Sequence, residues 1–197
     1  MMSTEAPERH ASTSGIDKVP SVVLAIVLFV CSEAIFFSAL FAAWFTARGR
    51  ATQWPPAGIE IHPTLGAVAS GLLILSSVQI YQARLMIRRE GDARGMARLL
   101  WGGIILALVA LALQLIDLAE VNFTVATNGF GTIYWTTSIL DSAHVAGAVV
   151  FAFLVLDRKW MGVIRRNNHD LMTAAAIFWH FVVGLSVFTF LVLEVVS

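Results

Sequence analysis

Hydrophobic residues along this chain gather into five long, nearly continuous stretches separated by shorter polar segments. The apolar stretches run over residues 20–46, 65–86, 99–121, 134–156 and 171–196. Each reaches the roughly 20 residues that a helix needs to cross about 30 Å of hydrocarbon. The runs are continuous and do not alternate with a period of two, which argues against a membrane β-barrel. The pattern predicts an all-α membrane protein, a bundle of five transmembrane helices.

Composition supports this prediction and limits what else the chain can contain. Of 197 residues, 58% are hydrophobic and 13% are charged, and the mean hydropathy is +0.79. Residues 1–19 are mostly polar and are expected to form a disordered cytoplasmic tail, with residues 20–197 forming one transmembrane domain. The single cysteine, Cys31, lies within the first apolar stretch, so a disulfide scaffold or a cysteine cluster for a metal is excluded.

The basic residues are distributed unevenly between the two ends of the predicted bundle. Eleven of the 13 Lys and Arg residues lie in the N-terminal tail, at Arg84 and in the segments 87–98 and 157–170. Only Arg48 and Arg50 lie in the opposite loops. The positive-inside rule therefore predicts that the N-terminus is inside and the C-terminus outside. We expect the basic end to meet anionic lipid and not nucleic acid.

One carboxylate interrupts the first apolar stretch, in the sequence SEAIFFSALF. Glu33 lies about 13 residues into that stretch, close to the predicted bilayer midplane. Burying its charge would cost several kcal/mol, and no Lys or Arg lies between Lys18 and Arg48 to offset that cost. A neutral, protonated carboxyl is therefore expected. It either hydrogen-bonds a neighbouring helix as a structural contact or handles protons and contacts lipid.

Further polar residues recur at helical spacing in the third and fourth stretches. Gln114, Asp117 and Glu120 are three residues apart and share one face, where Asp117 and Glu120 could simply extend to the outer membrane interface. Asp141 and His144 are likewise three apart and could hydrogen-bond or pair within the bundle. These residues are candidates for polar contacts inside the bundle.

A second histidine, His180 in the sequence FWHF, leaves a haem-binding alternative open. A single membrane histidine usually serves as a hydrogen-bonding partner. Helical rise, however, places His144 and His180 at similar depths, which a low-spin haem with two axial histidines requires. A b-type haem membrane protein is therefore one alternative. A di-iron site is not supported, because no Glu-x-x-His pair lies in any apolar stretch.

Six stretches carry a resemblance to a known family: SEAIFFSALFAAWF, WPPAG, LQLIDLAEVNFT, GFGTIYW, LDSAHVAG and FWHFV. In this order they resemble subunit III of haem-copper terminal oxidases of the cytochrome c oxidase type, in its short five-helix form. The resemblance covers residues from about 20 to the end and matches Glu33 to the family's reactive intramembrane carboxylate. The chain departs from the family pattern at three positions: Asp141 replaces a His, Asp117 a Glu, and Val183 an Asp.

This resemblance implies a subunit that binds no haem, copper or other metal and has no catalytic residue of its own. Haem and copper are expected in partner subunits, and the chain is expected to pack against catalytic subunit I and subunit II. It would bind membrane lipids, stabilise the complex and sustain proton uptake while O2 is reduced to water, and a larger respiratory supercomplex is a further expected partner. The expected location is the inner (plasma) membrane of a bacterium. The departures leave a subunit III-like accessory protein of a quinol oxidase or nitric oxide reductase as a second alternative.

Overall fold

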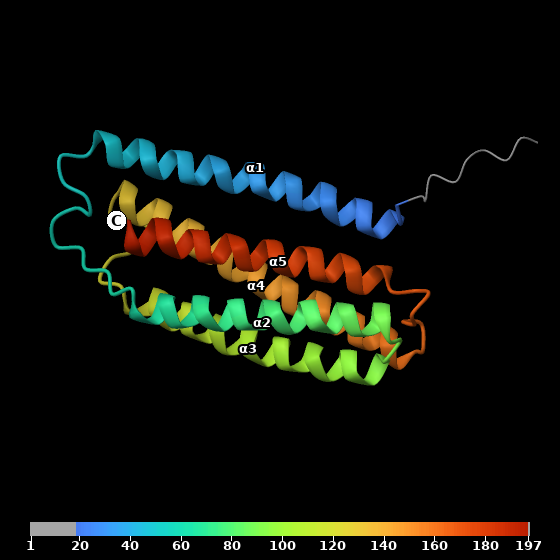
Figure 1. Cartoon of the computed structure of the whole chain (residues 1–197). Coiled ribbons are helices and arrows are strands. Elements are labelled where there is room, and N and C mark those ends of the chain that lie inside the picture. Colours follow the sequence, from blue (N-terminus) through green and yellow to red (C-terminus); the bar gives the residue numbers. More distant parts are fainter. Residues whose placement is uncertain (1–18, 197) are drawn as a thin grey trace, which may run out of the picture.

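The computed structural model describes residues 19–196 and consists of five long α-helices followed by a short π-helix (Figure 1). Their bounds are Ser21–Arg50 (α1), Thr64–Arg89 (α2), Ala93–Glu120 (α3), Gly129–Trp160 (α4), Asp170–Phe190 (α5) and Leu191–Val195 (η1). The first four helices, and α5 together with η1, are each long and apolar enough to cross a membrane. The predicted fold class and the five spans are confirmed. The predicted tail, apart from Val19, lies outside the described residues, and the predicted orientation remains a prediction.

The helices extend beyond the apolar stretches into the polar segments. Helix α3 begins at Ala93, before the apolar stretch that starts at residue 99. It does so because the Asp92 side chain accepts hydrogen bonds from the Arg94 and Gly95 amides, both at 2.9 Å. Asn128 caps α4 in the same way through the Gly131 amide, also at 2.9 Å. Such caps satisfy amides that a helix leaves unpaired at its start. Hydropathy marks only the part of a helix that needs hydrocarbon, so most helix ends lie beyond the predicted limits, whereas the start of α1 and the ends of α3 and η1 lie one residue inside them.

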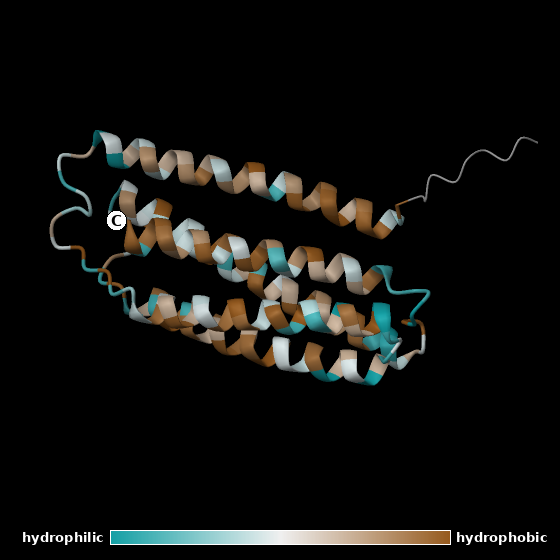
Figure 2. Cartoon of the chain, viewed as in Figure 1, coloured by the Kyte–Doolittle hydropathy of each residue, from teal (hydrophilic) through white to brown (hydrophobic). Residues whose placement is uncertain are grey.

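Helices α2 to α5 pack together, and α1 lies along one edge of this group (Figure 1). The packing of α2 on α3 is the most extensive, whereas α1 packs mainly on α4 and α5. Only 6% of the most apolar window of α1 is buried within the protein, compared with 56% for the last span. Figure 2 shows hydrophobic residues along much of α1. This helix therefore leaves most of its apolar surface free for lipid or another protein.

An aromatic cluster joins α1 to the rest of the bundle, at the end of the bundle predicted to lie on the outer side of the membrane. Trp44 of α1 is fully buried and contacts Phe130 of α4, with ring centroids 4.9 Å apart. Trp54, from the 51–63 segment that links α1 to α2, packs edge-on against Trp44 at 4.8 Å. Aromatic side chains bury a large apolar area at a small cost in side-chain entropy. The segment 51–63 is anchored by these contacts.

Candidate functional site

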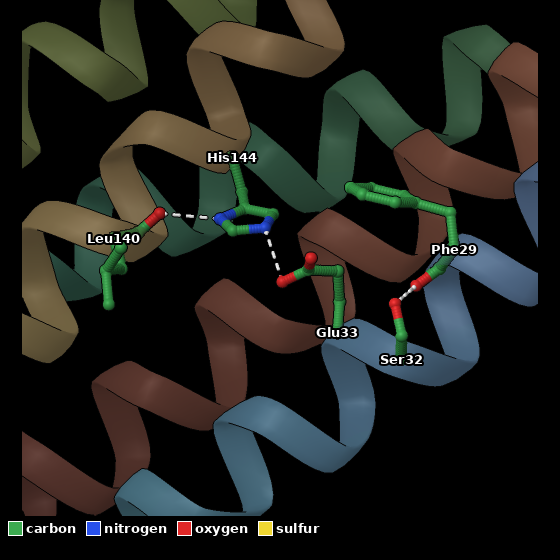
Figure 3. Close-up of polar contacts among 5 residues, drawn as sticks. All are labelled: Phe29, Ser32, Glu33, Leu140 and His144. Carbon is green, nitrogen blue, oxygen red and sulfur yellow. Dashed lines mark hydrogen bonds and ion pairs between the residues drawn. The ribbon is translucent and has the colours of Figure 1, made fainter.

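Glu33 and His144 meet between α1 and α4 (Figure 3). The Glu33 Oε2 and His144 Nε2 atoms are 3.1 Å apart. The other ring nitrogen, Nδ1, lies 2.7 Å from the Leu140 carbonyl oxygen, one turn earlier on α4. A carbonyl can only accept a hydrogen bond, so Nδ1 must carry a proton and donate it. This contact fixes both the orientation and the tautomer of the imidazole.

The fixed tautomer limits the Glu33–His144 contact to two arrangements that differ by the position of one proton. If the imidazole is neutral, Nε2 is an acceptor and the Glu33 carboxyl must be protonated to donate to it. If the proton moves to Nε2, the same contact becomes an imidazolium–carboxylate ion pair. Apolar surroundings favour the neutral arrangement, because separated charges lose the solvation that water provides. The contact can therefore hold one exchangeable proton.

The surroundings of this pair are apolar but not closed. Phe37 packs edge-on against the His144 ring, with centroids 5.2 Å apart and planes at 81°. The side chains of Glu33 and His144 are 20% and 13% exposed, respectively. Glu33 thus contacts a neighbouring helix, which is one of the two roles considered for it, and its role in proton handling or lipid contact stays a prediction. A reagent or lipid in the membrane can reach its carboxyl, because the pair lies at the edge of the bundle.

Asp141 lies one turn before His144 on α4 but faces a different part of the protein. Its Oδ2 atom accepts hydrogen bonds from the Ser186 hydroxyl at 2.6 Å and from the Gln114 amide at 3.1 Å. The same Gln114 amide lies 3.4 Å from Ser186 Oγ. This network links α3, α4 and α5, and Asp141 is 3% exposed. Gln114 and Asp141 were both predicted as bundle contacts, and the structure joins them.

The remaining predicted polar residues have separate positions. Asp117 is half-buried and lines a small internal cavity, so its carboxyl is not simply extended to the membrane interface, whereas Glu120 is exposed. His180 lies between α5 and α2, with Nδ1 2.5 Å from Ser77 Oγ. Both nitrogens of His144 are engaged by Leu140 and Glu33. His144 is thus bonded to Glu33 of α1, whereas His180 is bonded to Ser77 of α2, and the haem alternative stays a prediction.

Two residues of the polar interior were not found by sequence reasoning. Ser186 completes the contact with Asp141, but a serine in an apolar helix gives no signal of its partner. Glu194 lies in η1 and lines the same cavity as Asp117. From the sequence it resembles an ordinary charged residue at the end of a span. Within residues 19–196, no group of three or more His, Cys, Asp or Glu side chains is arranged to hold a metal ion.

Comparison with known proteins identifies the family of this chain. Residues 5–196 match the family described as cytochrome c oxidase subunit III. A subunit 3 from Thermostichus vulcanus is 27% identical over 176 residues, which cover 89% of this chain and 87% of that protein. The Neurospora crassa subunit 3 is 30% identical over 169 residues, covering 81% of this chain and 61% of the relative. The Synechocystis protein of the same name is 30% identical over 164 residues, covering 81% and 69%, respectively. The chain belongs to the cytochrome c oxidase subunit III family.

Proposed function

We propose that this chain is the non-redox subunit III of a respiratory haem-copper oxidase complex that reduces O2 to water. The observation that carries the proposal is the Glu33–His144 contact. It positions a proton-exchanging pair at the edge of the bundle, and its acid is the one matched to the family's reactive intramembrane carboxylate. Haem and copper would be held by partner subunits, and subunits I and II would be the direct partners.

The exposed apolar face of α1 supports a role in assembly and lipid binding. Large side chains on this helix, including Leu28, Ile35 and Phe36, are 63%, 73% and 45% exposed, respectively. A face of this kind is stable only against lipid tails or another hydrophobic protein surface. In a complex, the catalytic subunit and bound lipid would cover it. The complex would lie in the plasma membrane of a bacterium.

Glu33 would support proton uptake by passing one proton across its contact with His144. A protonated acid at the edge of the bundle can exchange hydrogen bonds with a partner or a lipid head group without burying a net charge. Proton supply becomes limiting at high pH and during sustained turnover. The contribution of Glu33 should therefore appear under these conditions and not in the initial rate.

Purification of the intact complex on a tag attached to this chain, in mild detergent, tests the assignment. We expect haem-containing subunits to copurify and the preparation to consume O2. Recovery of the chain without haem subunits would overturn the proposal. Reduced cytochrome c, a quinol and nitric oxide, supplied separately to the same preparation, distinguish the oxidase from the quinol oxidase and nitric oxide reductase alternatives.

The role of Glu33 is tested within that complex by Glu33→Gln. The initial O2 consumption should be near normal, and the rate should decline faster over many turnovers or at high pH. Ser38→Ala is a matched control, because Ser38 lies on the same helix and its hydroxyl bonds only within α1, to the Ala34 carbonyl at 2.6 Å. Equal decline in wild type, Glu33→Gln and Ser38→Ala would leave Glu33 with a structural role only.

The proposed orientation has its own test. A reagent that cannot cross the membrane should label a cysteine introduced at Arg94 only from the cytoplasmic side. A cysteine at Asn128 should react only from the outside, because the two positions lie at opposite ends of α3 and its connection to α4. The reverse pattern would contradict the orientation.

A further inference from the structure

A small polar cavity lies inside the bundle toward the end that carries the 51–63 segment. Its volume is about 30 Å³. Residues from α2, α3, α4, α5 and η1 line it, among them Gly66, Asp117, Tyr134, Asp141, Thr189 and Glu194. This space is enough for one or two water molecules. The lining is polar, unlike that of an apolar void, which stays dry.

Several oxygen atoms around the cavity lack a hydrogen-bond partner among residues 19–196. They include Asp141 Oδ1 and Thr189 Oγ1, whose residues are only 3% and 5% exposed. Gln114 Oε1 and Glu194 Oε2 are also buried without a partner. Buried polar atoms in native proteins almost always have a protein or water partner. Several such oxygens beside one small cavity are the set of partners that a buried water needs.

Gly66 shows that the fold makes room for a carboxyl in this cavity. A Cβ atom at this position would lie 2.2 Å from Glu194 Oε2, closer than any real contact. The Glu194 carboxyl therefore packs against the glycine backbone of α2 and is held inside the bundle. The position of Glu194 thus depends on the packing between α2 and η1, which requires a glycine at position 66.

A second cavity of about 30 Å³ lies beside the first, nearer the surface. Asp117 and Tyr134 line both cavities, and the second is completed by the surface-side residues Glu60, His62 and Glu120. Glu60 and Glu120 are exposed to the surroundings. Asp117 therefore stands between the buried Asp141 and the aqueous end of the bundle.

We propose that the inner cavity is a water-binding site that connects the Asp141 carboxyl to the aqueous phase by way of Asp117. The titratable groups facing Asp141 are Asp117 from α3, Tyr134 and His144 from α4, and Glu194 from η1; α2 contributes only neutral residues. Asp141 Oδ2 is occupied by the Ser186 and Gln114 donors, so Oδ1 is the atom that faces water. During proton exchange with the aqueous phase, one proton leaves the Asp141 carboxyl through water and another returns, so the protonation state of Asp141 is unchanged.

Hydroxyl-radical labelling of the intact complex, read by mass spectrometry, tests the water site. Radicals made by irradiation form from bound water and modify the side chains beside it. Tyr134 is 2% exposed and lines the cavity, so it should be modified despite its burial. Trp179 is an internal control: it is also 2% exposed, donates to Ser76 Oγ at 3.0 Å and borders only an apolar gap too small for water. Ser70→Val, which fills the cavity, should lower Tyr134 modification several-fold.

Equal modification of Tyr134 and Trp179, or no change in Ser70→Val, would overturn the water site. The connection is tested separately by infrared spectroscopy of the complex transferred to D2O, in a Glu33→Gln background. A protonated carboxyl band should shift within minutes, be missing in Asp141→Asn and shift several-fold more slowly in Asp117→Leu. A band that does not exchange, or exchange unaffected by Asp117→Leu, would overturn the connection. Neither measurement depends on oxidase turnover, so both can fail while the proposed function stands. If Ser70→Val does not assemble, the exchange measurement decides.

Discussion

Helix α4 carries two polar side chains one turn apart, and they belong to two different kinds of site. His144 faces the edge helix α1 and lies 3.1 Å from Glu33, at a contact whose side chains are 13% and 20% exposed. Asp141 faces α3 and α5 and bonds the neutral donors Gln114 and Ser186 at 3% exposure. The edge contact joins an acid to a base, whereas the inner network joins an acid to neutral groups.

The edge contact is therefore suited to chemical reaction, whereas the inner network is suited to holding the helices in place. The Glu33–His144 contact is reachable from the membrane and changes state when one proton moves. The Asp141 network is buried where three helices meet, and its hydrogen bonds fix how α3, α4 and α5 sit together. Interhelical hydrogen bonds of this kind are worth about 1 kcal/mol each in a membrane. We therefore expect the two acids to respond differently to reagents and to mutation.

The largest expected difference is toward an apolar carbodiimide, which enters from the membrane and requires a protonated carboxyl. In the intact complex, Glu33 should be modified and Asp141 should stay below detection by peptide mass spectrometry. The reason is access, because Asp141 is enclosed by three helices. Glu33→Gln supplies the control and should abolish the modification. Modification of Asp141 or Asp117 ahead of Glu33 would remove the distinction between the two sites.

Mutation should affect the two acids in the opposite order, because the stability of the subunit should depend more on Asp141 than on Glu33. Asp141→Leu removes the acceptor for Gln114 and Ser186 and should lower the stability of the assembled subunit by about 2 kcal/mol. Thermal unfolding of the purified complex, together with retention of this subunit in detergent, measures the loss. Asp141→Asn keeps an acceptor oxygen and should lose much less. An equal loss in both variants would show that the network does not hold the helices together.

A smaller loss of stability is expected at the edge contact. Glu33→Leu leaves His144 Nε2 without its partner and should cost about 1 kcal/mol. Glu33→Gln can still donate an amide hydrogen to Nε2 and should cost less. The same unfolding and retention measurements apply. If Glu33→Leu were more damaging than Asp141→Leu, the edge contact would be the main structural link and the comparison would be wrong.

The five spans could be predicted from the sequence because a membrane imposes their length and hydropathy on each helix separately. Glu33 and His144 could each be recognised as unusual for the same reason. Their pairing could not, because they are 111 positions apart and meet only when α1 packs on α4. No local pattern determines which helices become neighbours.

The inner network shows a second limit of the sequence. Asp141 and Val183 were recognised as departures from the family pattern, and Val183 places an apolar residue where the family has an Asp. The structure supplies a polar partner one turn later, where Ser186 donates to Asp141. Glu194 went unnoticed because its inward position depends on Gly66, a residue from another helix. Both the partner of Asp141 and the position of Glu194 depend on contacts between helices, which the sequence of one helix does not reveal.

The smallest effect is expected for a third acid, Asp92, which lies outside the membrane-spanning segments and provides a reference for the other two. The pKa of its carboxyl lies below the ordinary value of 3.8, mainly because the carboxyl accepts a hydrogen bond from the Gly95 amide. The hydrogen bond from the Arg94 amide and the nearby positive charge of Arg98 lower the pKa to a smaller extent. Because the pKa is lower in the folded state, its stabilising effect is complete above about pH 4 to 5 and is lost as the pH falls through the folded pKa.

Asp92→Ala removes this cap and should lower the unfolding midpoint less than Asp141→Leu or Glu33→Leu does, and Asp92→Asn, which keeps a capping oxygen, should change it less still. The difference between wild type and Asp92→Ala should be constant from about pH 6 to about pH 9 and should narrow toward about pH 3. Unfolding midpoints across this range provide the measurement. Because Asp92 does not titrate near neutral pH, a pH-dependent change in turnover there cannot come from this cap. If Asp92→Ala altered sustained turnover at high pH as Glu33→Gln is expected to, the effect could not be assigned to the proton held between Glu33 and His144.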